Sequence, residues 1–293
     1  MVRTKRITTG TDVVTANISF EFFPPQTAEG VEKLRAARAK LAALEPEFFS
    51  VTYGAGGSTR EHTLEVVFDI QREVLPVAPH ISCIGATRET TRELLTRYQA
   101  AGIRRIVALR GDLPSGTADA GEFRYANELV EFIRRESGDW FHIEVGCYPE
   151  WHPQAKSPKD DLLAFKRKID AGANSAITQF FYNFDAYAAF VDAARGLGIE
   201  APIVPGIMPI GSFSKLARFA DACGAEIPRW LRRQFEAYGD DTASIRALGL
   251  DVVTGLCEQL LAAGAPGLHF YTLNQAGLTT EIVTRLRSRQ DEP

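Results

Sequence analysis

The 293-residue sequence predicts an α/β protein, a single-domain (β/α)8 TIM barrel with extra helices before the last strand. Short β-rich runs alternate with helical periodicity from end to end, which is typical of parallel strands joined by crossover helices. Eight such runs occur, the number that closes a barrel, and a chain of this length fills one barrel domain. An open, doubly wound sheet is the alternative.

The expected strands are short runs rich in Val, Ile, Phe and Tyr, which are residues favoured in strands. The fourth run, residues 105–111, continues an apolar stretch that begins at Ile103. This stretch is apolar on both faces, as in a buried parallel strand. In chain order the runs cover residues 17–23, 48–54, 80–85, 105–111, 141–147, 175–181, 202–208 and 267–273.

The segments between these runs carry helix signals. Residues 28–44 repeat apolar side chains at helical spacing. Residues 157–174 start with Ser157 as a candidate cap and Pro158 in the first turn, and Gly172 can end the helix. Acidic residues near the start and basic residues near the end of this segment complement the helix dipole.

We expect one catalytic domain over residues 1–293, with residues 1–16 as a flexible N-terminal arm. The arm is basic but lacks the continuous apolar core of a signal peptide. The interval 209–266 is long enough for two or three helices, including one near 227–239, and these are the expected extra helices.

The composition argues against several partner classes. A net charge of −4 gives no electrostatic reason to expect nucleic acid or an anionic membrane as a partner. No run approaches the roughly 18 apolar residues of a membrane span. The four cysteines form no CxxC pair, which favours reduced thiols in the cytoplasm. The histidines and cysteines have no metal-ligand spacing, so no metal site is expected.

Polar residues stand at or near the ends of the predicted strands. In a TIM barrel the functional site lies where the carboxyl ends of the strands meet. Charged and polar side chains are reasonable there, whereas they would be costly in a core. The residues at these positions are Glu21, Thr52, Tyr53, His80, Arg110, Gly111, Asp112, Tyr148, His152, Gln179, Tyr271 and Asn274.

Glu21 stands between Phe20 and Phe22, and two interpretations are open. Apolar surroundings would disfavour its charged form and suit a general acid, a role worth about 10²–10⁴ in rate. Alternatively, Glu21 alternates outward, away from the phenylalanines, and bonds a neighbouring backbone. Asp112 has a similar alternative, as a turn residue that closes "RGDLP". An aldolase-type barrel is disfavoured, because none of the eight runs contains a Schiff-base lysine.

Together the motifs resemble the methylenetetrahydrofolate reductase family, in the family's order and over almost the whole chain. The length is similar to that of bacterial members that consist of the catalytic domain alone. The matching pieces are "SFEFFPP", "VTYGAGG", "APHISCIGAT", "IVALRGDLP", "YPEWHP", "LLAFKRKIDAGANSAITQFFYN", "PIVPGIMPI" and "HFYTLNQ".

The resemblance implies a barrel that binds FAD and reduces 5,10-methylenetetrahydrofolate to 5-methyltetrahydrofolate. NADH or NADPH would reduce the flavin and leave, and the folate would then take its place in a ping-pong cycle. Relatives differ in nicotinamide preference, and the sequence contains no motif for a 2′-phosphate. The family also forms dimers and tetramers, so a homo-oligomer is expected.

The resemblance also implies roles for individual residues. Glu21 would be the general acid, and Asp112 would lie beside both flavin and pterin. Substrate-binding positions would be Glu21, Asp112, Gln179, Phe219 and Gln275. Flavin-binding positions would be Thr52, His80, Leu109, Arg110, Gly111, Asp112, Tyr125, Ala126, Tyr148, His152, Asp161 and Lys168.

Two positions depart from the family pattern. Gln275 stands where many relatives carry an arginine that contacts folate, and Trp151 stands where relatives are often aliphatic. Both could alter substrate affinity or cofactor preference. The alternatives to the reductase are a flavin-independent reductase and a non-catalytic barrel that binds reduced folates.

Overall fold

A computed structural model of the chain describes residues 17–53, 57–73, 75–111 and 121–290. The predicted arm at residues 1–16 and the predicted site residue Asp112 lie outside the described residues. The strands are β1 (Asn17–Phe22), β2 (Phe48–Val51), β3 (Val77–Ser82), β4 (Arg105–Leu109), β5 (His142–Cys147), β6 (Ser175–Thr178), β7 (Ile203–Val204), β8 (Gly206–Ile207) and β9 (Gly267–Tyr271).

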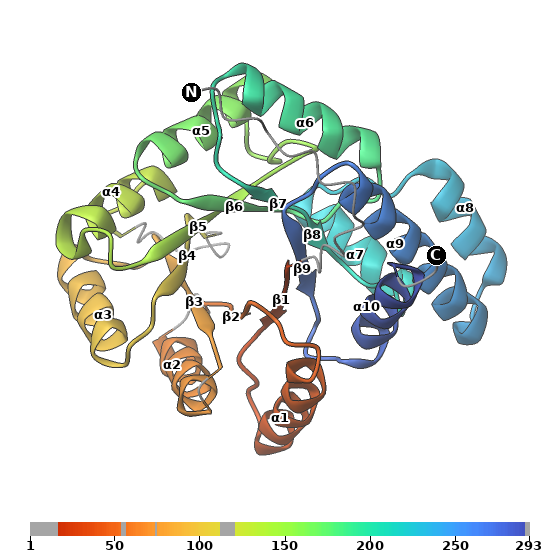
Figure 1. Ribbon diagram of the computed structural model, residues 1–293, viewed down its shortest axis with the longest axis horizontal. Helices are drawn as coiled ribbons and strands as arrows, with labels where there is room; N and C mark the ends of the chain where they lie inside the picture. Colours follow the sequence, from red (N-terminus) through yellow and green to blue (C-terminus); the bar gives the residue numbers. More distant parts are fainter. Residues whose placement is uncertain (1–16, 54–56, 74, 112–120, 291–293) are drawn as a thin grey trace, which may run out of the picture.

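Helices follow the strands and form a ring around them (Figure 1). They are α1 (Ala28–Ala42), α2 (Gly57–Arg72), α3 (Arg88–Ala100), α4 (Ala126–Ser137), α5 (Pro158–Asp170), α6 (Phe184–Gly196), α7 (Phe213–Cys223), α8 (Arg229–Tyr238), α9 (Thr242–Ala262) and α10 (Gly277–Gln290). The predicted extra helices are α7 to α9, which lie between β8 and β9. The cap of α5 is also as predicted, since the Ser157 hydroxyl accepts a hydrogen bond from the Asp160 N–H.

All strand pairs are parallel, in the order β7-β6-β5-β4-β3-β2-β1-β9-β8. The two ends of this order, β7 and β8, are consecutive in the chain and are separated only by Pro205. The sheet therefore closes on itself, and the predicted TIM barrel is confirmed over the open-sheet alternative.

Most observed strands end one to three residues before the predicted runs, and two differ in further ways. The third begins at Val77 rather than His80, so His80 lies within the strand and not at its start. Pro79 is a poor local signal for this extension, because proline gives no hydrogen bond to a ladder. The seventh run is divided by Pro205, which leaves two strands of two residues each.

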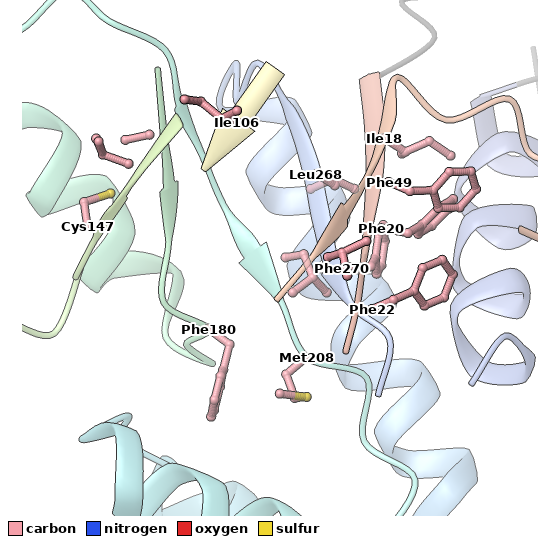
Figure 2. Packing of buried hydrophobic residues seen from close by; sticks show 14 of the residues in the cluster. Ile18, Phe20, Phe22, Phe49, Ile106, Cys147, Phe180, Met208, Leu268 and Phe270 are labelled. Carbon is pink, nitrogen blue, oxygen red and sulfur yellow. The ribbon is translucent and has the colours of Figure 1, made fainter. Parts of the chain in front are cut away.

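Successive strand residues point to opposite sides of the barrel wall. Ile18, Phe20, Phe22 and Phe49 point outward and pack in the layer between strands and helices (Figure 2). The rings of Phe22 and Phe49 stack with centroids 5.4 Å apart. The barrel interior holds a small apolar cluster formed by Phe48, Ala78, Val107 and Ile177. The strand residues that point inward therefore determine which polar groups the barrel interior contains.

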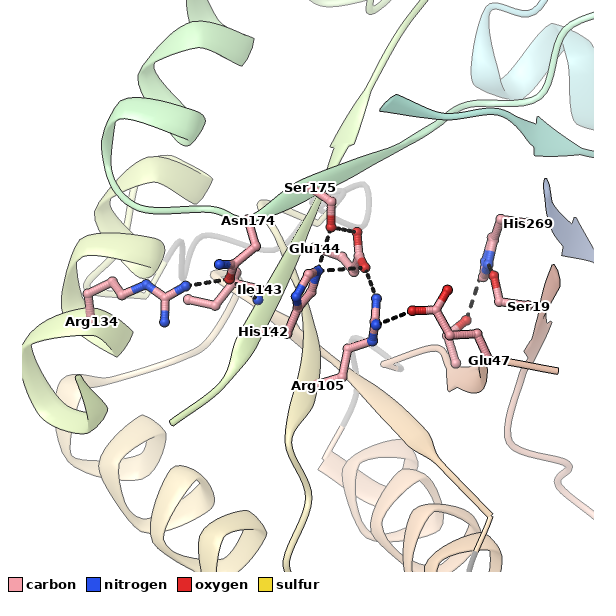
Figure 3. A network of polar contacts seen from close by, with 11 residues as sticks. Ser19, Glu47, Arg105, Arg134, His142, Ile143, Glu144, Asn174, Ser175 and His269 are labelled. Atoms are coloured by element: carbon pink, nitrogen blue, oxygen red, sulfur yellow. Dashed lines mark hydrogen bonds and ion pairs between the residues drawn. The ribbon is translucent and has the colours of Figure 1, made fainter. Parts of the chain in front are cut away.

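A polar network fills the amino-terminal mouth of the barrel (Figure 3). Buried Glu144 accepts a hydrogen bond from the Ser175 hydroxyl at 2.5 Å and pairs with Arg105 and His142. Arg105 also pairs with Glu47 at the rim. Burial alone would raise the pKa of Glu144, but hydrogen bonds from His142 and Ser175 and the Arg105 charge outweigh it, so the pKa lies below its usual value.

This network predicts a loss of stability in Glu144→Ala. The substitution removes the buried carboxylate that Ser175, His142 and Arg105 all contact, so we expect the free energy of unfolding at neutral pH to fall by about 3 kcal/mol. Because the folded pKa of Glu144 is depressed, its contribution is complete above about pH 4.5 and is lost as the pH falls through the lower folded value. Urea unfolding of variant and parent should therefore converge in acid.

Glu47→Ala is the matched control, because Glu47 contacts the same arginine from an exposed position. It should cost under about 1 kcal/mol. Equal losses from the two substitutions would contradict a buried network centred on Glu144.

Candidate functional site

The carboxyl ends of the strands surround a cavity of about 490 Å³. Every strand from β1 to β6 contributes to its lining directly or through the residue that follows it, and β9 and the segment after β8 complete it. Predicted site residues that line it are Glu21, Thr52, His80, Leu109, Gly111, Tyr148, Gln179 and Phe219.

A second cavity of about 280 Å³ extends toward the starts of α4 and α5. It shares Leu109, Gly111, Gly146 and Tyr148 with the first cavity, so the two form one elongated space. Predicted residues in this outer part are Arg110, Tyr125, Ala126, His152, Asp161 and Lys168. The structure thus brings together the predicted flavin-binding set, apart from Asp112, which is outside the described residues.

Gln275 lies apart from both, in a third cavity of about 130 Å³. This cavity borders the first through Phe219 and Tyr271. Lys215 also lines it, a residue that the sequence did not single out. Its position in the first turn of α7 is unfavourable for a cation, because the helix dipole is positive there. Helix stability therefore does not explain this lysine.

Glu21 points into the barrel, away from Phe20 and Phe22, which lie in the outer layer. Of the two interpretations of Glu21, the one in which the phenylalanines surround its carboxyl group is wrong, and its alternation away from them is confirmed, because neighbouring strand residues face opposite sides. Instead, its Oε2 lies 3.4 Å from Nε2 of His80 and 3.7 Å from Nε2 of His269. Glu21 retains a partly exposed side chain on the cavity wall.

His80 is buried beside this carboxylate. Burial lowers its pKa, and the nearby Glu21 charge only partly opposes that effect. Its imidazole is therefore neutral at neutral pH. Among the described residues, its Nε2 has no hydrogen-bond partner, which is unusual for a buried polar atom. This nitrogen can therefore bond either a ligand in the cavity or, after a small movement, Glu21 Oε2 at 3.4 Å.

The outer cavity is lined by a partly buried lysine. Lys168 on α5 donates a hydrogen bond from Nζ to the Gly146 carbonyl oxygen. Burial lowers the pKa of Lys168, and nearby Asp161 only partly offsets this effect. Asp161 is itself held by the backbone N–H of His152, at 2.9 Å. With Arg110 and Arg167 also in the lining, this part of the space suits an anionic group.

Gly111, which has no side chain, lies where the two cavities join. Gly111 has a φ of +80°, and a Cβ there would lie 2.2 Å from the Ser82 hydroxyl oxygen. Only glycine fits this position without a shift. Glycine at this position therefore allows the chain to pack against Ser82 between the two cavities.

Sequence reasoning missed His269. It lies on β9 with its side chain fully buried, and Nδ1 is 2.7 Å from the Ser19 hydroxyl oxygen. The available signal was an isolated histidine two residues before Tyr271, which places both on the same side of the strand. A strand's terminal residues alone do not reveal such a position.

No group of three or more potential metal ligands occurs among the described residues. Burial raises the pKa of the Cys83 thiol to about 12 and also raises the pKa values of Cys147 and Cys257. None of the helices, over the part of the chain that the structure describes, is long and apolar enough to cross a membrane.

Comparisons with known proteins agree with this geometry. The family model described as methylenetetrahydrofolate reductase matches residues 6–287. A 5,10-methylenetetrahydrofolate reductase of Pectobacterium carotovorum is 43% identical over 94% of this chain and 91% of its own length. The Escherichia coli protein of that name is 42% identical over 93% and 91%. A solved structure from Clostridium thermocellum, 17% identical, shares the fold with a TM-score of 0.66 over 94% and 95%.

The partly buried Lys168 predicts an unusual effect of Lys168→Met on stability. Since burial disfavours the ammonium group, we expect the ligand-free variant to gain about 1 kcal/mol in free energy of unfolding at neutral pH. The folded pKa is lowered, so this gain should shrink as the pH rises through it toward the usual value of 10.5. Urea unfolding across alkaline pH measures both effects.

Lys166→Met is the control on the same helix, because Lys166 forms a partly exposed ion pair with Asp170. It should lower the free energy of unfolding by no more than about 0.5 kcal/mol. A large loss of stability in Lys168→Met would mean that surrounding groups fully compensate its charge.

Proposed function

The chain belongs to the methylenetetrahydrofolate reductase family, and on this premise we propose that it reduces 5,10-methylenetetrahydrofolate with FAD and NAD(P)H. The observation that carries the proposal is the elongated space, which has Glu21 and an orphaned histidine nitrogen at its centre and three cationic side chains, Arg110, Arg167 and Lys168, at its outer end. The Clostridium thermocellum protein that shares the fold binds two copies of 5-methyl-5,6,7,8-tetrahydrofolic acid.

The residues present fit a flavin dinucleotide. His80 Nε2 lacks a partner on the inner wall, and Gly111 lies without a side chain where the two cavities join. Arg110, Arg167 and Lys168 provide positive charge for phosphates. When bound, FAD would accept a hydride from the nicotinamide and pass it to the folate. In the proposal the flavin-binding residues are Thr52, His80, Leu109, Arg110, Gly111, Asp112, Tyr125, Ala126, Tyr148, His152, Asp161 and Lys168.

Glu21 is the proposed general acid. Reduction of the methylene carbon requires its bond to N10 to open, and N10 must then gain a proton. The Glu21 carboxyl group lines the inner cavity and can supply that proton. Because His80 is neutral, it adds no positive charge that would stabilise the deprotonated form of Glu21. Asp112 is proposed to tune flavin and pterin together.

Gln179 and Phe219 are proposed to hold the substrate. The Gln179 Oε1 accepts a hydrogen bond from the Phe180 N–H at 3.0 Å, so its amide N–H groups are directed to a ligand. Phe219 is a largely exposed ring that lines both the first and third cavities. It can stack on the folate or on the nicotinamide, which share one slot in turn.

The third cavity is proposed to receive the glutamate tail of the folate. Gln275 cannot provide the charge of the arginine that many relatives carry, but Lys215 lines the same cavity and is a cation. The charge for the tail carboxylates would then come from α7 rather than from the segment after β9.

The remaining parts of the proposal are a cytoplasmic location and a homo-oligomer. Trp230 and Tyr238 on α8 are large apolar side chains that are exposed in the single chain and available for subunit contact. The choice between NADH and NADPH stays open, although a rice relative, 39% identical over 92% of this chain and 48% of its own length, is named a probable methylenetetrahydrofolate reductase (NADH).

A visible absorption spectrum of the purified protein tests the proposed function. A flavin spectrum should bleach when NADH is added anaerobically and recover on addition of methylenetetrahydrofolate. A colourless protein that also does not bind added FAD would refute the flavin assignment. It would favour the flavin-independent reductase or the non-catalytic folate-binding barrel.

Glu21→Gln should separate the two half-reactions. Flavin reduction by NADH should remain within a few-fold of the parent, whereas reoxidation by methylenetetrahydrofolate should slow by roughly 10²–10⁴ because the general acid is lost. Stopped-flow absorbance measures both. Unchanged folate turnover would show that Glu21 is not the acid.

Phe219→Ala and Lys215→Met form a matched pair on α7. Loss of the stacking ring should raise KM for both substrates by roughly tenfold. Loss of the cation should raise KM for methylenetetrahydrofolate by a similar factor and leave KM for NADH unchanged. Steady-state kinetics with each substrate varied in turn distinguishes them, and a shared effect of Lys215→Met on NADH would contradict the tail site.

A further inference from the structure

Each turnover of the proposed reaction consumes one proton. The hydride carries an electron pair from the nicotinamide to the methylene carbon, so the proton that ends on N10 must come from water. Glu21 can donate it once and must then be reprotonated. Because ligands would fill the cavity at the carboxyl ends of the strands during the reaction, the resupply of this proton is a separate structural question.

A fully buried histidine lies on the other side of Glu21. The Nε2 of His269 is 3.7 Å from Glu21 Oε2 and 3.5 Å from the Ser50 hydroxyl oxygen. Its Nδ1 is 2.7 Å from the Ser19 hydroxyl oxygen. Closing the longer gap requires movement of under about 1 Å, which is within ordinary side-chain motion. The two ring nitrogens therefore connect Glu21 with Ser19.

Ser19 lines a cavity at the opposite mouth of the barrel. This space of about 130 Å³ exceeds the volume that a water molecule needs. Its wall includes Glu47, Arg105, His142 and Glu144, the polar groups of the amino-terminal network (Figure 3). Such a polar space suits water. Ser19 thus contacts both this cavity and His269, and His269 faces Glu21.

We propose, on the basis of the proposed reductase function, that Ser19 and His269 return a proton to Glu21 from the amino-terminal mouth. Water in that cavity gives a proton to Ser19 as the Ser19 hydroxyl gives its own to His269 Nδ1. His269 then releases the proton on Nε2 to the Glu21 carboxylate. The hydroxide left in the cavity takes a proton from solvent, and the Ser19 hydroxyl rotates back. After product release, Nε2 takes a proton from water that enters the emptied first cavity, while the Nδ1 proton leaves through Ser19, and the ring is again in its first tautomer. No bond other than these O–H and N–H bonds changes.

Ser19 and His269 act through Glu21 and need not touch the substrate. If a histidine is buried only for packing, both of its ring nitrogens contact groups of one local network. Here its two nitrogens face residues that line cavities at opposite ends of the barrel. The geometry therefore separates the side where the proton is used from the side where it enters.

The test follows hydride transfer and proton uptake in the same sample. Protein reduced with one equivalent of NADH is mixed with methylenetetrahydrofolate in weak buffer that contains a pH indicator. Flavin absorbance reports the first hydride transfer, and the indicator reports uptake of the proton. Ser19→Ala removes only the hydroxyl. His269→Gln keeps a hydrogen-bonding amide near the position of Nε2 but cannot pass a proton through a ring.

In the parent, proton uptake should keep pace with the first turnover. Both variants keep Glu21 itself, so the first turnover should stay within about threefold, while proton uptake should lag by roughly tenfold or more. Ser175→Ala is the control, because Ser175 lines the same cavity without contacting His269, and it should show no lag.

Uptake at the parent's rate in Ser19→Ala and His269→Gln would overturn the relay. An equal lag in Ser175→Ala would also overturn it, since general loosening of the mouth would then be the cause. If the parent itself does not reoxidise its flavin with methylenetetrahydrofolate, the proposed function fails instead. Melting temperatures identify a variant that does not fold, and the other variant then decides.

Discussion

The structure depends on one geometric constraint, the period of two along strands that close into a barrel. Each strand residue faces either the helices or the barrel interior, and no third environment exists for it. On β1 this places Phe20 in the helix-covered layer and Ser19 and Glu21 in the interior. Eight parallel runs of this kind turn an ordinary apolar chain into a wall with a packed outer side and a selectively polar inner side.

The fold could be predicted from the sequence because local sequence patterns indicate how many strands there are and how they alternate with helices. The alternation of strand and helix patterns and the cap at Ser157 required no knowledge of distant contacts. Extension of β3 to Val77 was missed because Pro79 is a poor local signal for a strand. Inside a barrel, neighbouring strands and helices override that local preference.

The site was harder to predict, because its properties arise between strands. Parity along β1 shows only that Glu21 opposes its phenylalanine neighbours, and it does not identify what lies across the barrel. His80 and His269 approach Glu21 from β3 and β9, which are far apart in the chain. Resemblance to a family located Glu21 and His80 one by one but not His269, and the mutual distances and burial of all three come only from the closed fold.

The division of the barrel wall at Pro205 has a mechanical consequence. β7 and β8 contribute two residues each, so few backbone hydrogen bonds hold this part of the wall. Their amide protons are expected to exchange with solvent sooner than those of the longer strands. The chain continues from β8 into α7, which carries Phe219. One side of the slot proposed for the folate and nicotinamide rings is therefore attached, through α7, to the two shortest strands of the barrel wall.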